Sequence, residues 1–349
     1  MPLQAILTRY EPAVSGLRWV SVSGGFSGAE VWRGDDANGS PIFALKAWPE
    51  EMTASRLGSI HQWMTQAAHL PFVPAVLRTN RGTTVVSHAE RNWDLQQWRP
   101  GENLANPSTA DVVAACVAVA QLHLAWSGQG EGVCPGVLNR LRILADFRTQ
   151  FGNGIGSPPV SEALLSLLRQ AWAVVAASAA WAEQLLRPWR TRLVPLRSCV
   201  RDLRNEHVLF SQGAVSGIVD YGAMAVDHPG VDLARFLGDV AAVDETRFTA
   251  GVQAYRQVAP LEMADEFVRA LLQTGVVCSV IGWLVRLVRP RGPWLANGAI
   301  GEERIYKSLA EAGGTGRAIR AEVRIRRFSP PNCYSRRNQR NLRAPRFDS

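Results

Sequence analysis

The sequence predicts an α+β protein of two lobes, with a small antiparallel β-sheet first and a mainly helical part after it. Short apolar, β-branched runs separated by glycine turns fill the first hundred residues. Longer alanine- and leucine-rich stretches with helical spacing follow them. The length of 349 residues exceeds what one small core needs and suits two linked lobes.

The first lobe is expected to begin as a meander of three strands, at residues 17–22, 29–33 and 41–48. Glycine turns separate them, and the second turn, Asn38-Gly39-Ser40, is typical of a hairpin. A helix is predicted over 51–69, and two further strands over 73–77 and 83–88. The Pro100-Gly101 pair then marks a natural break between the lobes.

The second lobe is predicted to be mainly helical, with helices at 109–126, 161–189 and 231–240 and further helices to about 312. Two short β-like pieces, 208–210 and 215–219, interrupt them. The chain is therefore divided into an N-terminal lobe (1–100), a helical lobe (101–314) and a tail (315–349). The tail is rich in Arg, Asn, Ser and Pro, which predicts disorder.

The net charge of +8 is concentrated in this tail. Residues 317–349 contain ten arginines and two acids, so the rest of the chain is neutral. The charge therefore does not indicate that the folded body binds nucleic acid. A role in binding RNA or another polyanion stays open for the tail alone.

The cysteines and the apolar segments point to a cytoplasmic protein without a membrane partner. The five cysteines are scattered and form no CxxC pair, which argues against a disulfide framework or a zinc site. The most apolar run, between Arg269 and Arg286, holds 16 residues and is short for a membrane span. The N-terminus lacks the basic and apolar regions of a secretory signal, so none is expected.

A glycine-rich turn and a strand lysine are the first candidates for chemistry. Gly24, Gly25, Phe26, Ser27 and Gly28 lie between two expected strands. Such a turn lets backbone N–H groups approach phosphate oxygens closely, although a plain hairpin turn has the same composition. Lys46 lies in the third expected strand, where its side chain faces solvent or reaches into a site.

Two aspartates give the strongest signal. Asp202 and Asp220 lie 18 residues apart, and each adjoins a short apolar β-like run. A hairpin of these two runs would bring both carboxylates to one end. One could then accept a hydroxyl proton while the other held a divalent metal on phosphates.

The surrounding segments resemble the aminoglycoside phosphotransferase and choline kinase-like family of small-molecule kinases, which have a protein-kinase-like fold. The matching segments read Val200-Arg-Asp-Leu-Arg-Asn-Glu-His-Val-Leu-Phe210, Gly217-Ile-Val-Asp-Tyr-Gly222 and Asp227-His-Pro-Gly-Val-Asp-Leu-Ala234. The Leu122-His123 pair late in a helix also fits, and the resemblance covers about residues 15–310.

The resemblance implies ATP and Mg²⁺ as cofactors and a role for each matching residue. Asp202 would be the catalytic base, Asp220 the principal metal ligand, and Lys46 the cation on the α- and β-phosphates. Residues Gly24 to Gly28 would cover the phosphates and Gln97 would lie near the adenine. Asp232 would steady the catalytic loop.

Two departures from the family pattern bear on catalysis. The metal-binding asparagine is replaced by His207, which accepts Mn²⁺ more readily than Mg²⁺. Alternatively Asn205 supplies the oxygen, or His207 holds an ion through water. No acidic residue lies between Glu51 and Glu90 to pair with Lys46 from a helix, which leaves the neutral side chains His61, Gln62 and Gln66.

The sequence thus predicts an ATP-dependent phosphotransferase that acts on a hydroxyl of a small molecule. The alternative is a nucleotide-binding pseudokinase that serves as a scaffold or sensor, suggested by the two departures. A protein kinase is disfavoured, because only 12 residues separate Asp220 from Asp232 and leave little room for a peptide-docking segment. The acceptor and the oligomeric state are left open.

Overall fold

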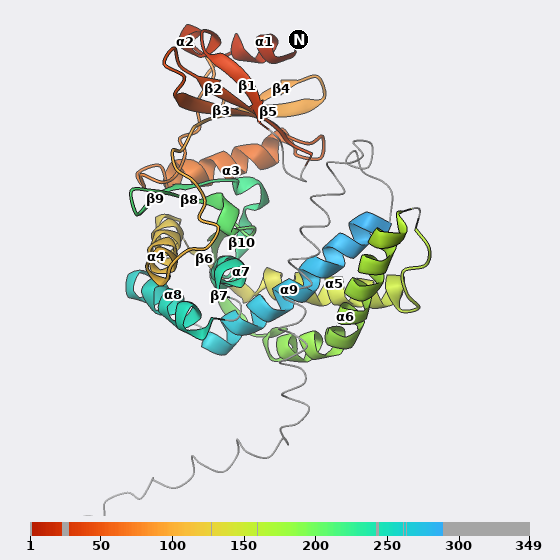
Figure 1. Cartoon of the computed structure of the whole chain (residues 1–349). Coiled ribbons are helices and arrows are strands. Elements are labelled where there is room, and N and C mark those ends of the chain that lie inside the picture. Colours follow the sequence, from red (N-terminus) through yellow and green to blue (C-terminus); the bar gives the residue numbers. More distant parts are fainter. Residues whose placement is uncertain are drawn as a thin grey trace, which may run out of the picture.

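The computed structural model describes residues 2–288, except 23–27, 127, 159, 242–243, 261 and 263. Figure 1 shows a small β-sheet lobe beside a larger, mainly helical lobe. This arrangement confirms the predicted α+β class with two lobes. The predicted helices beyond 288 and the basic tail lie outside the described residues, and the lobe boundaries at 100 and 314 stay predictions.

The first lobe contains a five-stranded antiparallel sheet in the order β1-β2-β3-β5-β4. Its strands are β1 (Arg18–Val22), β2 (Glu30–Asp35), β3 (Pro41–Ala47), β4 (Val86–His88) and β5 (Arg91–Gln97). The first three confirm the predicted meander. The strand predicted at 73–77 is wrong, because only Val76 forms an isolated bridge, with Gln96. Pro74 within that segment has no N–H to donate to a ladder.

Helices lie on both sides of this sheet (Figure 1). The short helices α1 (Pro2–Leu7) and α2 (Pro12–Ser15) were not predicted. Their side chains form a small core with one face of the sheet, made by Ile6, Leu7, Tyr10, Val14, Leu45, Ala47, Trp93 and Leu95. The predicted helix α3 (Ala54–Gln66) lies between the sheet and the helical lobe, and its Ile60 and Met64 join the large core of that lobe.

Six long helices build the described part of the helical lobe. They are α4 (Thr109–Ala125), α5 (Pro135–Phe151), α6 (Glu162–Leu186), α7 (Gly230–Val240), α8 (Glu245–Val258) and α9 (Asp265–Val288). Helix α4 packs against α8, and α9 packs against α5, α6 and α7. By length and composition alone, Leu164–Trp189 and α9 could cross a membrane, and both also contribute side chains to the large core.

Short strands and 3₁₀ helices complete the described part of this lobe. A hairpin joins β8 (Val208–Ser211) to β9 (Ala214–Ile218), as predicted. A second sheet, in the order β10-β7-β6, combines β6 (Gly128–Val133), β7 (Leu193–Cys199) and β10 (Ala225–Asp227). It was not predicted, since β6 is glycine-rich and β10 has three residues. The 3₁₀ helices are η1 (Arg187–Trp189), η2 (Asn205–His207) and η3 (Tyr221–Ala223).

Candidate active site

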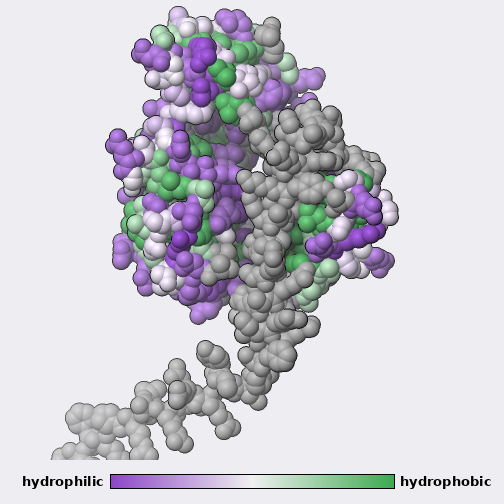
Figure 2. Space-filling view, in the orientation of Figure 1, coloured by the Kyte–Doolittle hydropathy of each residue, from purple (hydrophilic) through white to green (hydrophobic). Residues whose placement is uncertain are grey.

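A cavity of about 340 Å³ lies where the two lobes meet. The sheet contributes Val31, Ala44, Lys46, Gln96 and Gln97, and the helical lobe contributes Leu209, Val219, Asp220 and Tyr221. The volume and the mixture of apolar walls with a few charged groups suit a small-molecule ligand. On the face seen in Figure 2, hydrophilic side chains are spread over both lobes rather than gathered into one patch.

Lys46 reaches across this cavity from β3. Its Nζ lies 2.8 Å from Oδ1 of Asp220 in the opposite lobe. The same ammonium lies 3.9 Å from the centre of the Trp48 ring, a cation–π contact. The lysine is therefore held within the site rather than turned to solvent.

Asp220 follows β9 and has a left-handed backbone, with φ 63° and ψ 67°. This conformation is uncommon for a residue other than glycine and is found often at functional sites. Burial would raise the pKa of this carboxyl. The charge and hydrogen bond of Lys46, the nearby His207 and the backbone N–H of Gly222 together lower the pKa below its usual value. Asp220 is therefore ionised at neutral pH.

His207, in η2, faces the same carboxylate. Its Nδ1 lies 2.8 Å from the backbone oxygen of Asp202 and must donate, because a carbonyl oxygen only accepts. In the neutral ring this leaves the lone pair on Nε2, which lies 3.8 Å from Oδ2 of Asp220. An imidazole nitrogen and a carboxylate oxygen so placed fit a divalent cation between them.

Asn205, the alternative metal ligand, makes hydrogen bonds to residues other than Asp220. Its amide nitrogen donates to the backbone oxygen of Leu104 at 2.7 Å, and its backbone N–H donates to Asp239 at 3.1 Å. His207 rather than Asn205 is thus the η2 side chain that the structure records beside Asp220.

Asp202 lies just before η2, and its side chain is 52% exposed. Oδ1 accepts a hydrogen bond of 3.2 Å from Nε of Arg235 on α7. Arg235 is held in turn by Asp239, one helical turn further along, at 3.0 Å. We did not predict this partner, although Arg235 follows Asp232 by three residues and so shares its side of the helix.

Asp232, on α7, fixes the turn that precedes Asp202. Its two carboxylate oxygens accept the backbone N–H groups of Val200 at 2.7 Å and of Arg201 at 2.6 Å. Arg201 has a positive φ of 67°, so these bonds hold a strained turn directly before Asp202. This geometry agrees with the steadying role that the resemblance implies.

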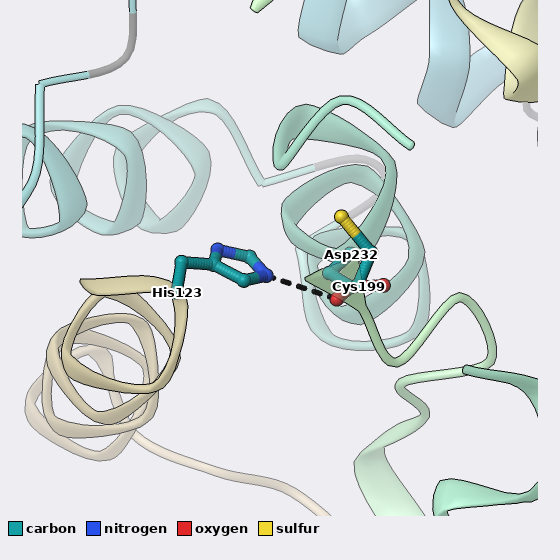
Figure 3. A group of neighbouring side chains, drawn as sticks. All are labelled: His123, Cys199 and Asp232. Atoms are coloured by element: carbon teal, nitrogen blue, oxygen red, sulfur yellow. Dashed lines mark hydrogen bonds and ion pairs between the residues drawn. The ribbon is translucent and has the colours of Figure 1, made fainter. Parts of the chain in front are cut away.

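His123, Cys199 and Asp232 form a buried group whose ligand-type atoms lie close enough for a metal (Figure 3). Each of them is already engaged. His123 bonds Asp232 at 3.0 Å through Nε2 and the hydroxyl of Tyr255 at 2.8 Å through Nδ1. Burial raises the pKa of the Cys199 thiol, which keeps it protonated. We interpret the group as a structural hydrogen-bond network.

The structure contradicts the suggestion that α3 orients Lys46 through neutral side chains. His61 instead bonds Oδ2 of Asp94 at 2.8 Å and the hydroxyl of Thr84 at 2.9 Å. Gln62 and Gln66 line a separate cavity, which does not include Lys46. Asp94, which is fully buried in β5, was not predicted, because the partner expected for a strand lysine is an acid on the helix.

The remaining predicted residues are Gln97, which lines the cavity, Gly28, which is not among the residues that line it, and four that lie outside the described residues. Gln97 lines the cavity, and its backbone N–H donates to the carbonyl oxygen of Ala75 at 2.8 Å. Gly28 has a positive φ of 73°, as the turn before β2 requires. Gly24, Gly25, Phe26 and Ser27 lie outside the described residues.

Comparison with known proteins identifies the fold. The model of a family described as "Phosphotransferase enzyme family" matches residues 18–265. No curated protein matches the sequence. Similar solved structures include a spectinomycin phosphotransferase, APH(9)-Ia, with ADP and spectinomycin, with a TM-score of 0.64 and 12% identity over 89% of this chain and 93% of that one.

Two further structures of this kind are similar over nearly their whole length. An amicoumacin kinase, hAmiN, solved with AMP-PNP and Ca²⁺, has a TM-score of 0.59 and 13% identity over 90% of this chain and 92% of that one. A microcompartment-associated aminopropanol kinase has a TM-score of 0.55 and 14% identity over 90% and 94%. These likenesses confirm the kinase-like fold.

Proposed function

The chain belongs to the phosphotransferase enzyme family, and from this premise we propose that it transfers the γ-phosphate of ATP to a hydroxyl of a small molecule. One observation carries the proposal. Lys46 and Asp220 line one cavity and lie 2.8 Å apart. His207 lies 3.8 Å from Asp220 and 2.8 Å from the backbone oxygen of Asp202, so three segments of the chain bring the four residues together. These are the groups that phosphoryl transfer requires: a phosphate-binding cation, metal ligands and a group that orients the hydroxyl.

Each residue has a separate task in this proposal. The cavity holds the nucleotide, with Gln97 near the base and Lys46 on the α- and β-phosphates. Asp202 accepts the hydroxyl proton of the acceptor, and the Arg235 hydrogen bond fixes the rotation of its carboxylate. For Gly24 to Gly28 we propose the role on the phosphates that the resemblance implies.

Asp220 and His207 are the residues that would hold a divalent metal. Bound there, Mg²⁺ or Mn²⁺ supplies positive charge to the phosphate oxygens. The neutral His207 tautomer directs a nitrogen lone pair to this position, and an imidazole ligand makes Mn²⁺ a good alternative to Mg²⁺.

The acceptor class follows from the family rather than from one neighbour. The similar structures are kinases of chemically different molecules, among them spectinomycin, amicoumacin and aminopropanol. We therefore propose a small hydroxylated acceptor and no particular antibiotic. The four cysteines of the described chain are free, which suits the cytoplasm.

ATP turnover and thermal stabilisation by ATP test the proposal, each measured with Mg²⁺ and with Mn²⁺. Binding raises stability by RT ln(1 + [L]/Kd). Asp202→Ala is expected to keep binding and to lower turnover by about 10²–10⁴-fold. Asp146→Ala is the matched control, because Asp146 is similarly exposed (51%) but lies on α5 and pairs with Arg142.

The outcomes separate the two candidate functions. Turnover that disappears in Asp202→Ala but persists in Asp146→Ala supports the kinase. Nucleotide binding without turnover, even in a screen of hydroxylated acceptors, favours the pseudokinase, which the absence of an acid in the described residues of α3 motivates. Folded protein that binds no nucleotide contradicts both.

A further inference from the structure

A buried carboxylate lies beside Lys46 in the sheet. Lys46 on β3 and Asp94 on β5 are directly paired across the two strands. Residues paired in this way point to the same face of a sheet, with Cβ atoms about 4.5–5.5 Å apart. Asp94 is fully buried on the face that carries Lys46.

The two oxygens of Asp94 differ. Oδ2 accepts from Nε2 of His61 at 2.8 Å and from the side-chain amide of Gln96 at 2.9 Å. Oδ1 is buried and has no hydrogen-bond partner within the described chain. Leaving a buried carboxylate oxygen unpaired is costly, so this atom is a vacant acceptor for a nearby donor.

The carboxylate is also held in a fixed orientation. His61 is anchored on its other ring nitrogen by the hydroxyl of Thr84 at 2.9 Å. Because a carboxylate only accepts, His61 donates to Asp94 through Nε2. His61 on α3 thus holds Oδ2 of Asp94 in place, while Oδ1 can still accept a hydrogen bond.

The contact that Lys46 makes in this structure competes with the proposed reaction. Its partner, Asp220, is the residue proposed to hold the metal. A divalent cation held by Asp220 would repel the ammonium, and bound phosphates would attract it. The lysine then needs a second anion on its own lobe, and its four-carbon stem spans the distance to a cross-strand neighbour.

We infer that Asp94 is the positioning residue for Lys46. When nucleotide and divalent metal occupy the cleft, the ammonium moves from Asp220 to Oδ1 of Asp94, which holds it against the phosphates. Asp94, fixed by His61, thereby supplies from β5 the negative charge that the described residues of α3 lack. This inference rests on the proposed function.

A double-mutant cycle tests the inference, with Asp94→Asn, Lys46→Met and the double variant. Asparagine keeps the shape of Asp94 and removes its charge. The readouts are Kd for magnesium AMP-PNP, kcat and KM for ATP, and the melting temperature without ligand. Asp35→Asn is the matched control, because Asp35 is an equally buried aspartate of the same sheet that pairs with Arg18 and Arg33.

We expect Asp94→Asn to weaken nucleotide binding or kcat/KM by about tenfold or more, the size of a lost charge-assisted hydrogen bond. In a protein that already carries Lys46→Met, Asp94→Asn should cause little further loss of nucleotide affinity or kcat/KM. Asp35→Asn should lower the melting temperature and leave nucleotide affinity unchanged. Asp94→Asn within twofold of wild type, or effects that simply add in the double variant, would overturn the inference.

A structure of the wild type with magnesium and AMP-PNP gives a second test that needs no variant. The Lys46 Nζ to Asp94 Oδ1 distance is expected to fall to about 2.7–3.2 Å. A lysine still on Asp220 would refute the transfer while leaving the proposed function intact. A wild type that binds no nucleotide would remove the proposed function, and this inference with it.

Discussion

The two sides of the cleft hold their charged groups in opposite ways. On the helical side, Asp232 is fully buried and accepts three hydrogen bonds, from Val200, Arg201 and His123. On the sheet side, Lys46 is bound to a partner in the other lobe, and Asp94 has an unpaired oxygen. A carboxylate with every contact satisfied fixes a loop in one conformation. A cation with two acids in reach is suited to change partner during a reaction cycle.

The largest effect is expected from breaking the helical side. In Asp232→Asn the amide nitrogen replaces one acceptor, so one of the two loop N–H groups faces a donor. We expect a loss of about 2–4 kcal/mol in the free energy of unfolding, measured by urea denaturation. Asp239→Asn, on the same helix but partly exposed, should cost less than about 1 kcal/mol. Equal losses in both variants would contradict the comparison.

A pH effect of intermediate size should come from His228, a buried histidine on the helical side. Burial and the nearby His123 lower its pKa to about 3, against about 6.5 when unfolded. Between these values the unfolded chain binds a proton that the folded chain does not. Stability is therefore lost as the pH falls below about 6.5, by at most about 1.4 kcal/mol per pH unit.

His228→Asn isolates this contribution. Asparagine can still accept the backbone N–H of Gly230, which His228 accepts through Nδ1 at 3.0 Å, but it does not titrate. Denaturation of both proteins between pH 7 and pH 4 should show a shallower decline for the variant. Parallel declines would show that His228 is not responsible.

The smallest effect is expected on the sheet side without ligand. Lys46→Met removes an ion pair whose acid is 41% exposed, so solvent screens much of the interaction. The unliganded free energy of unfolding should change by less than about 1 kcal/mol, while ATP affinity falls. A loss as large as that of Asp232→Asn would mean that Lys46 is a structural residue, and the contrast between the two sides would fail.

The sequence predicted the parts of this molecule that are encoded locally. Apolar, β-branched runs between glycine turns indicated β1 to β3, helical spacing indicated α3, and long apolar stretches indicated helices such as α4. The hairpin of β8 and β9, which carries Asp220, was also expected. Prediction failed for the second sheet and for 73–77, where short, glycine- or proline-containing segments give no clear period.

The site shows the same division. The sequence alone determined which residues we propose for the chemistry, because Asp202, His207 and Asp220 lie in one short segment with a recognisable pattern. The tertiary structure decided their partners: Asp220 for Lys46, 174 residues away, and Arg235 for Asp202. It also paired Asp94 with Lys46 across two strands and placed His61 within hydrogen-bond distance of Asp94. Such pairings depend on strand register, helix packing and burial, which bring distant residues together and appear in no local pattern.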